Sequence, residues 1–244
     1  MISKSPVSRP SLQLLGLEPW RAAMEYAAMR IAQPVAGPSG DGHPVVVFPG
    51  LASDQRAIEP LTSFCRRLGY PTHDWGRGFN AGPQGDVERW LAALAGDIHQ
   101  IAQAHGQRLS LIGWSLGGIY AREVAKRIPG DVRQVITIGT PFAGPPDQSN
   151  VGWLYHVLSR QPAPMDAKLQ ADLCVAPDVP TTSIYSRSDG IVAWQNCIQS
   201  GHRSDVENIE VDGSHCGLGW NTKVLSVLAD RLGQPESSWE AYEQ

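Results

Sequence analysis

Short apolar runs alternate with helical patterns along most of the chain. The run PVVVFPG at 44–50 is apolar at almost every position, which is typical of a strand covered on both faces of a sheet. Strands are predicted at 44–50, 69–75, 108–114, 132–140, 181–187 and 206–212. Between them, apolar residues recur every three or four positions, which predicts helices at 17–33, 58–68, 86–104, 116–128 and 221–232.

This alternation of strands and helices predicts the fold class. A strand, a helix and a further strand form a βαβ unit, whose two strands run parallel. We therefore expect an α/β protein with a mostly parallel central sheet and helices on both faces. The alternation fails once, at 144–180, a proline-rich segment with an apolar helix candidate at 151–158 and no clear strand.

The irregular segment divides the chain into two parts. We interpret 144–180 as a small lid insertion at the carboxyl edge of the sheet, where open α/β sheets place their ligand sites. Residues 1–143 and 181–244 then form the core domain. The oligomeric state cannot be read from the sequence.

Composition and charge limit the kinds of partner that the protein is expected to bind. The chain of 244 residues is 42% hydrophobic and 18% charged, as in an ordinary globular protein. Its net charge of −4 argues against a nucleic-acid partner, which requires a basic surface. No apolar run is long enough to span a bilayer, and the N-terminal segment lacks the continuous apolar core of a signal peptide. The expected location is cytoplasmic.

The cysteines indicate neither a zinc site nor a disulfide scaffold. Cys65, Cys174, Cys197 and Cys216 are scattered, and no C-x-x-C pair occurs. A bridge between Cys197 and Cys216 stays open, although a reducing compartment disfavours it. No pattern supports a metal, nucleotide or haem site, so no cofactor is expected.

The first candidate catalytic motif is Gly-Trp-Ser-Leu-Gly at 113–117. This G-x-S-x-G string joins a predicted strand to a predicted helix, the context in which such a turn exposes a nucleophilic serine, here Ser115. Gly113 and Gly117 are expected to permit the bend, and Gly118 to let the helix pack close to the sheet. Trp114 is expected to pack beneath the turn.

A nucleophilic serine needs a histidine that accepts its proton and a carboxylate that orients the histidine. In strand–turn–helix sites of this kind the chain order is serine, acid, histidine. His215 directly follows the last predicted strand and is favoured over His156 and His202. Asp189 follows the strand at 181–187 and is favoured as the acid, with Asp205 and Asp212 as rivals.

An acyl intermediate also needs donors for its oxyanion. One is the backbone N–H of Leu116, the residue after the nucleophile, at the positive end of a helix. The second is expected from the loop after the first strand, where Gly50 allows a sharp turn that directs the N–H of Leu51 toward the site.

With these residues in place, the chain resembles an α/β-hydrolase of the esterase/lipase type over nearly its whole length. The segments that resemble a bacterial esterase/lipase-like group are Pro-Gly-Leu at 49–51, WGRGFNAGP at 75–83, GWSLGG at 113–118, GTPFAG at 139–144, SRSDGIV at 186–192 and GSHCG at 213–217. GWSLGG is also similar to the corresponding turn of pimeloyl-carrier methyl ester esterases. One departure is Phe48-Pro49-Gly50, which stands where many relatives have His-Gly.

The resemblance implies Ser115 as nucleophile, His215 as general base and acid, Asp189 as its orienting acid, and Leu51 and Leu116 as oxyanion donors. The expected reaction is hydrolysis of apolar small-molecule carboxylic esters through an acyl-enzyme. Alternatives are an acyltransferase or lactonase with the same triad, or a binding protein on a hydrolase scaffold. Candidate substrate-pocket residues are Trp114, Trp153, Leu154, Val157, Ile191, Val192 and Trp194.

Overall fold

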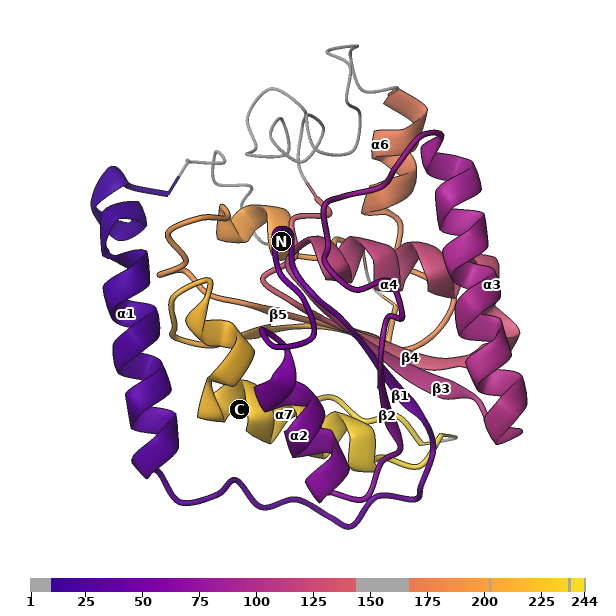
Figure 1. Ribbon diagram of the computed structural model, residues 1–244, viewed down its shortest axis with the longest axis horizontal. Helices are drawn as coiled ribbons and strands as arrows, with labels where there is room; N and C mark the ends of the chain where they lie inside the picture. Colours follow the sequence, from indigo (N-terminus) through magenta and orange to yellow (C-terminus); the bar gives the residue numbers. More distant parts are fainter. Residues whose placement is uncertain (1–9, 144–166, 202, 237, 244) are drawn as a thin grey trace.

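Six parallel strands form one sheet at the centre of the molecule (Figure 1). The computed structural model describes residues 10–143, 167–201, 203–236 and 238–243. The sheet order is β2-β1-β3-β4-β5-β6. The strands are β1 (Val45–Phe48), β2 (Thr72–Asp74), β3 (Leu109–Trp114), β4 (Val132–Ile138), β5 (Thr181–Tyr185) and β6 (Val206–Glu210). All six predicted strands are present, and the expected fold class is confirmed.

Alternate side chains of the strands enter two separate hydrophobic cores. In β1, Val46 and Phe48 pack into one core, and Val45 and Val47 pack into the other. All four are completely buried. Burial on both faces explains why the central strands are continuous apolar runs rather than alternating ones.

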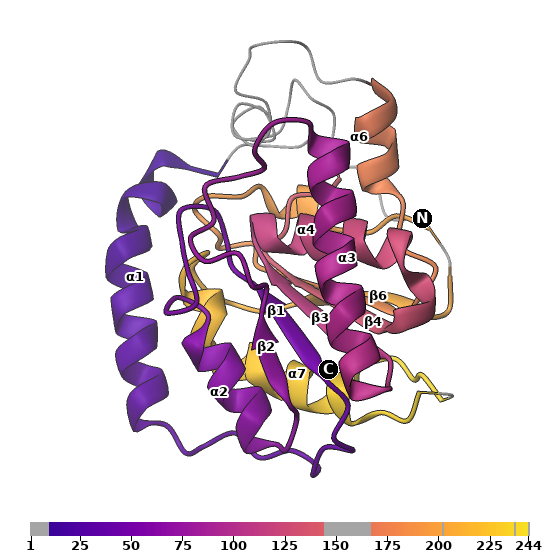
Figure 2. The same ribbon diagram turned by 45° about the vertical axis from the view of Figure 1, so that its right-hand side comes forward.

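Helices cover both faces of the sheet (Figures 1 and 2). The first core is closed by α3 (Val87–His105) and α4 (Leu116–Arg127), and α6 (Ala167–Cys174) lies on the same side. The second is closed by α2 (Glu59–Arg67) and α7 (Thr222–Gly233). Side-chain caps mark two predicted starts, since Asp86 accepts from the N–H of Arg89 and Asn221 from that of Val224.

Two helices differ from the sequence prediction. The first, α1 (Leu12–Ile31), begins five residues before the predicted start at 17, because Ser11 caps it and the helix continues through Pro19. Gln13 and Gly16 interrupt the apolar pattern before residue 17, which hid the first turn. The second is α6, which was not expected in the insertion; the helix candidate at 151–158 lies outside the described residues.

The strand register brings the carboxyl ends of the strands to one edge. Phe48 of β1 pairs with Gly113 of β3, and Ile138 of β4 pairs with both Trp114 of β3 and Ile184 of β5. The loops that follow β1, β3, β4 and β5 therefore leave the sheet side by side. Among the helices described, none combines the length and hydropathy needed to cross a bilayer.

Candidate active site

Ser115 occupies a sharp turn between β3 and α4. Its backbone dihedrals are φ 54° and ψ −123°, a conformation that costs a non-glycine residue about 1–3 kcal/mol. The Ser115 N–H donates to the Ile138 carbonyl at 2.8 Å, which fixes the turn to β4. The bend is therefore made by the serine itself and held by the neighbouring strand.

The glycines around the serine allow close packing rather than unusual backbone angles, since none of them has a positive φ. A methyl group on Gly117 would collide with the Phe48 carbonyl at the end of β1. One on Gly118 would collide with the Thr140 hydroxyl, and one on Gly113 with the Gly118 backbone. These contacts agree with the packing role expected of Gly118. The bend was expected at Gly113 and Gly117, but the unusual backbone angle belongs to Ser115.

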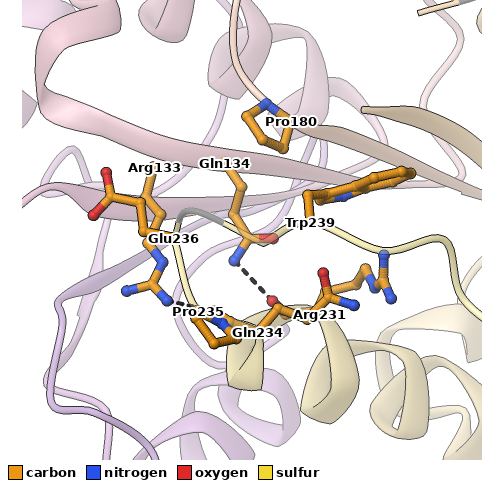
Figure 3. A pocket seen from close by; sticks show the side chains of 8 residues that line it. All are labelled: Arg133, Gln134, Pro180, Arg231, Gln234, Pro235, Glu236 and Trp239. Carbon is orange, nitrogen blue, oxygen red and sulfur yellow. Dashed lines mark hydrogen bonds between the residues drawn. The ribbon is translucent and has the colours of Figure 1, made fainter. Parts of the chain in front are cut away.

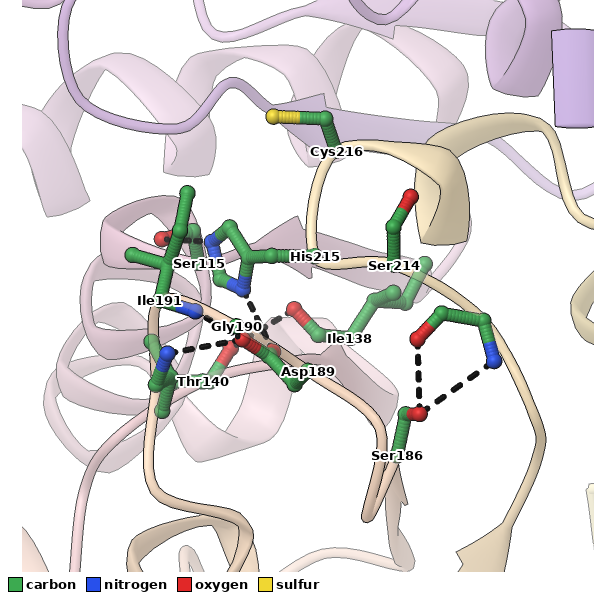
Figure 4. Close-up of polar contacts among 12 residues, drawn as sticks. Ser115, Ile138, Thr140, Ser186, Asp189, Gly190, Ile191, Ser214, His215 and Cys216 are labelled. Carbon is green, nitrogen blue, oxygen red and sulfur yellow. Dashed lines mark hydrogen bonds and ion pairs between the residues drawn. The ribbon is translucent and has the colours of Figure 1, made fainter. Parts of the chain in front are cut away.

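His215 connects the serine to an acidic residue. Its Nε2 lies 3.0 Å from the Ser115 Oγ, and its Nδ1 lies 2.6 Å from the Asp189 Oδ2 (Figure 4). The three residues follow β3, β5 and β6, and each is 5% exposed or less. Residues from three separate loops thus form one buried Ser–His–Asp chain of hydrogen bonds.

The second carboxylate oxygen of Asp189 is held by its own loop. Asp189 Oδ1 accepts the N–H of Ile191 at 2.8 Å and the N–H of Val192 at 2.7 Å (Figure 4). Both bonds hold Oδ1 in place and leave Oδ2 directed at the imidazole. Ile191 and Val192, predicted as pocket residues, therefore provide backbone contacts that orient the acid.

The two rival acids have other partners. Asp205 forms an ion pair with Arg203 at 2.7 Å. Asp212 accepts the hydroxyl of Ser188. Among the contacts of the described residues, neither carboxylate reaches His215.

The electrostatic surroundings of His215 favour its protonated form. Burial lowers the pKa of His215, but the charge of Asp189, its hydrogen bond and the charge of Glu18 outweigh burial and raise the pKa above its usual value. A histidine with this environment holds a proton readily after taking it from a neighbouring hydroxyl.

The turn after β1 lies beside the serine. A methyl group on Gly50 would lie 3.4 Å from the Ser115 Cβ. Leu116 is the first residue of α4, so its N–H has no acceptor within the helix. For the Leu51 N–H, too, the described residues provide no acceptor. Two free donors therefore belong to segments that adjoin the serine.

Asn80 holds the turn after β1, a role that was not predicted from the sequence. Its side-chain amide donates to the Pro49 carbonyl at 2.9 Å. Its backbone N–H donates to the Ser53 carbonyl, and its backbone carbonyl accepts the Ala52 N–H, both at 2.8 Å. Asn80 is completely buried. The only signal was its place in the glycine-rich loop 75–83, because the contact joins segments about thirty residues apart in sequence.

A second missed residue is Glu18 of α1. Its Oε1 accepts the N–H of Gly190 at 2.7 Å and the N–H of His215 at 3.0 Å. Separations of 172 and 197 residues hide this contact from any local sequence pattern.

The opposite end of the sheet holds a second Ser–His–Asp trio. His43 Nε2 lies 2.8 Å from the Ser110 Oγ, and His43 Nδ1 contacts Asp41. Ser110 is a completely buried residue within β3, without the strained turn of Ser115. Burial is the largest effect on His43 and lowers its pKa, the opposite of the direction at His215. This trio supports the packing of the strand starts.

The predicted pocket residues have varied positions. Trp114 is 7% exposed and packs in the second core, consistent with the expectation that it lies beneath the turn. Trp194 packs with Tyr185 in a small cluster beside Val192. Trp153, Leu154 and Val157 lie outside the described residues.

Ser115 lines neither of two hollows found in the described part of the molecule. The small one, about 10 Å³, lies where β4 begins, at the end of the sheet remote from the serine (Figure 3). The larger, about 770 Å³, lies between α1, α2 and the 3-10 helix η3 (Gly217–Trp220). The described residues contain no cluster of three metal-ligating side chains, and all four cysteines are free thiols.

No known family model matches the sequence. Solved structures are similar at low identity. Aspergillus fumigatus lipase B is 21% identical with a TM-score of 0.62, over 87% of this chain and 59% of that one. The mature form of the Bacillus licheniformis lipase BlEst2 is 19% identical with a TM-score of 0.59, over 83% of this chain and 96% of that one.

A third similar structure is the mouse alpha/beta hydrolase domain-containing protein 10, with 19% identity and a TM-score of 0.54 over 79% of this chain and 92% of that one. This chain thus spans 59% of the length of the Aspergillus lipase and most of the length of the other two. The parallel sheet, its flanking helices and these likenesses show that the protein has the α/β-hydrolase fold.

Proposed function

We propose that the protein is a serine hydrolase that cleaves carboxylic esters through an acyl-enzyme on Ser115. The observation that carries this proposal is the hydrogen-bond chain from Ser115 through His215 to Asp189 at a strained turn. The lipases among the similar structures support the same class of reaction.

In the first half-reaction, His215 Nε2 accepts the Ser115 hydroxyl proton while Oγ attacks the ester carbonyl carbon. Asp189 remains ionised and stabilises the imidazolium. The N–H groups of Leu51 and Leu116 donate to the oxyanion of the tetrahedral intermediate. The intermediate collapses, the ester C–O bond breaks, and the leaving alcohol takes the proton from His215.

In the second half-reaction, water replaces the alcohol. His215 removes a proton from the water as its oxygen attacks the acyl carbon, and the same donors hold the second oxyanion. Collapse returns the proton to Ser115 Oγ and releases the carboxylic acid. The reaction needs neither a metal nor a redox cofactor.

The proposed substrates are uncharged esters with small to medium or lipid-like acyl groups. Leu51, which follows Gly50 beside Ser115 and packs partly buried against the first core, fits an apolar acyl group.

Ser115→Ala tests the proposal. Hydrolysis of p-nitrophenyl butyrate should fall by about 10⁶-fold, because removal of the nucleophile disables the whole triad. Ser110→Ala is the matched control, since Ser110 also bonds a histidine but lies at the other end of the sheet, and this variant should hydrolyse the ester normally. Full activity of Ser115→Ala would contradict the proposal. Adding alcohol acceptors and identifying the products separates hydrolysis from acyl transfer.

A further inference from the structure

Helix α1 contacts both loops that carry the acid and the base. The Glu18 carboxylate is 3% exposed and accepts three backbone N–H groups. Two belong to Gly190 and His215, the first next to Asp189 and the second part of the base itself. The third is that of Cys216, at 3.3 Å. One buried side chain therefore joins the loop after β5 to the loop after β6.

Further contacts of α1 hold the same two loops. Glu25, two turns along the helix, accepts the N–H and the hydroxyl of Ser214 at 2.9 and 2.7 Å. Arg21 donates to the Ser188 hydroxyl at 3.0 Å. The helix thus binds the loops at three successive turns, and only its Glu18 contact includes the histidine.

The loops leave room for α1 only because they contain glycine. A methyl group on Gly190 would lie 2.6 Å from the Leu14 carbonyl and 2.8 Å from the Glu18 Cγ. One on Gly217 would collide with the Glu25 carboxylate. Real Cβ atoms do not approach backbone atoms this closely, so a larger residue at Gly190 would displace the helix, whereas one at Gly217 would displace the Glu25 side chain from its bonds to Ser214.

We propose that Glu18 is a positioning residue of the Ser115–His215–Asp189 site, which holds the acid loop and the base loop in one geometry. The proposal rests on the proposed function. Glu18 does not reach the ester; it acts through the His215 and Gly190 backbones. Loss of this bridge allows the two loops to move relative to each other, and an error of about 1 Å in a catalytic group can reduce a rate about 100-fold.

The negative charge of Glu18 also acts electrostatically on His215, which an uncharged side chain in the same place would not do. The charged groups that face His215 are Asp189 from the loop after β5 and Glu18 from α1; Glu25 and the Cys216 thiol lie next to them. After burial and Asp189, the charge of Glu18 is the next influence on the pKa of His215, which it raises. Replacing the carboxylate by an amide should therefore lower that pKa.

Two substitutions separate these effects. Glu18→Gln keeps an oxygen that can accept from Gly190 and His215 but removes the charge. Glu18→Ala removes the acceptor as well and leaves two buried N–H groups unpaired. We expect Glu18→Ala to reduce kcat by about 10- to 100-fold with less than about a threefold change in KM, because the substrate does not contact Glu18.

The diagnostic measurement is the pH dependence of Glu18→Gln. The acid limb of its kcat/KM profile for p-nitrophenyl butyrate should move to lower pH than in the wild type. Glu25→Gln is the matched control, because it removes a carboxylate from the same helix without contact to His215; its acid limb should stay in place. NMR titration of the His215 ring should show the same downward shift in Glu18→Gln only.

The NMR titration also distinguishes this proposal from the proposed function. If Ser115→Ala keeps its activity, the assigned reaction is wrong, yet the His215 titration still reports whether Glu18 acts on that ring. Equal midpoints in the wild type and Glu18→Gln would overturn the electrostatic effect of Glu18 on His215, as would an equal shift in Glu25→Gln. A folded Glu18→Ala variant with wild-type kcat would overturn the positioning role. Because Glu18→Gln retains the hydrogen-bond acceptor, the titration does not depend on Glu18→Ala folding.

Discussion

The indole N–H of Trp114 donates to the backbone carbonyl of His215 at 3.2 Å, and the two rings lie 6.2 Å apart. Trp114 ends β3 directly before the serine, while His215 lies in the loop after β6. The bond therefore ties the turn that contains Ser115 to the loop that contains His215. It accounts for a bulky residue inside the G-x-S-x-G turn: phenylalanine or leucine has no donor at this position.

We predict that Trp114→Phe weakens the site more than it weakens the fold. The phenyl ring keeps most of the apolar contact but leaves the His215 carbonyl unpaired, which costs about 1 kcal/mol in unfolding free energy. Ester hydrolysis should fall about tenfold, since the base loop loses one anchor. Trp75→Phe is the control, because Trp75 is also buried and its Nε1 donates to the Gly78 carbonyl at 3.0 Å. Equal loss of activity in both variants would contradict the prediction.

The pH–rate profile should reflect the environment of His215. Its neutral form accepts the serine proton, so kcat/KM falls as the pH drops below the pKa of the free enzyme. Burial lowers that pKa, but Asp189 and Glu18 together raise it above its usual value of 6.5. The midpoint of the acid limb should therefore lie above pH 6.5 when the profile is measured between pH 4 and 9; a lower midpoint would contradict this account.

The fold could be predicted from the sequence because its strands are coded locally. The valines of β1 and the apolar run of β3 are buried on both faces, so each strand is visible as a continuous apolar segment. The start of helix α1 was harder to predict, since Gln13 and Gly16 interrupt the apolar pattern of its first turns. Its position depends on contacts with loops more than 170 residues away, which no local pattern encodes.

Some residues of the candidate site could also be predicted from the sequence, and others could not. Ser115, Asp189 and His215 follow predicted strands, and the parallel topology brings such positions to one edge. Glu18 and Asn80 could not be found, because a carboxylate on a helix or an amide in a loop is usually solvated. Only the folded chain shows that both side chains are buried and bonded to the backbone of neighbouring loops.

Asp189→Asn should nearly abolish hydrolysis. The amide can present its N–H₂ to His215 Nδ1, which stabilises the wrong imidazole tautomer and reduces kcat by about 10⁴-fold. Asp205→Asn is the control, because that carboxylate pairs with Arg203 and should leave kcat unchanged. Steady-state kinetics on p-nitrophenyl butyrate measures both variants. A larger loss in Asp205→Asn would reassign the acid.

Cys216 should react slowly although it is partly exposed and lies next to His215 in the chain. Burial raises the pKa of its thiol to about 11, with further contributions from the charges of Glu18, Asp189 and Glu25. At pH 7.5 the thiolate, which is the reactive form, is therefore scarce. In a Cys174→Ser background, the rate of reaction with a disulfide reagent should rise about tenfold per pH unit up to about pH 10. Fast labelling at pH 7.5 would show that the thiol is not held protonated.

Two glycine substitutions should change stability in opposite directions. In Gly118→Ala, the new methyl group would lie 2.8 Å from the Thr140 Cβ and push α4 away from the sheet, which should destabilise the protein by about 1–3 kcal/mol. Gly96 lies exposed in the middle of α3, where a methyl group would meet nothing within 4 Å. Gly96→Ala should therefore stabilise the protein by up to about 1 kcal/mol, because alanine is the better helix former. Urea unfolding measures both changes, and a stabilised Gly118→Ala would show that α4 does not need the close contact that Gly118 allows.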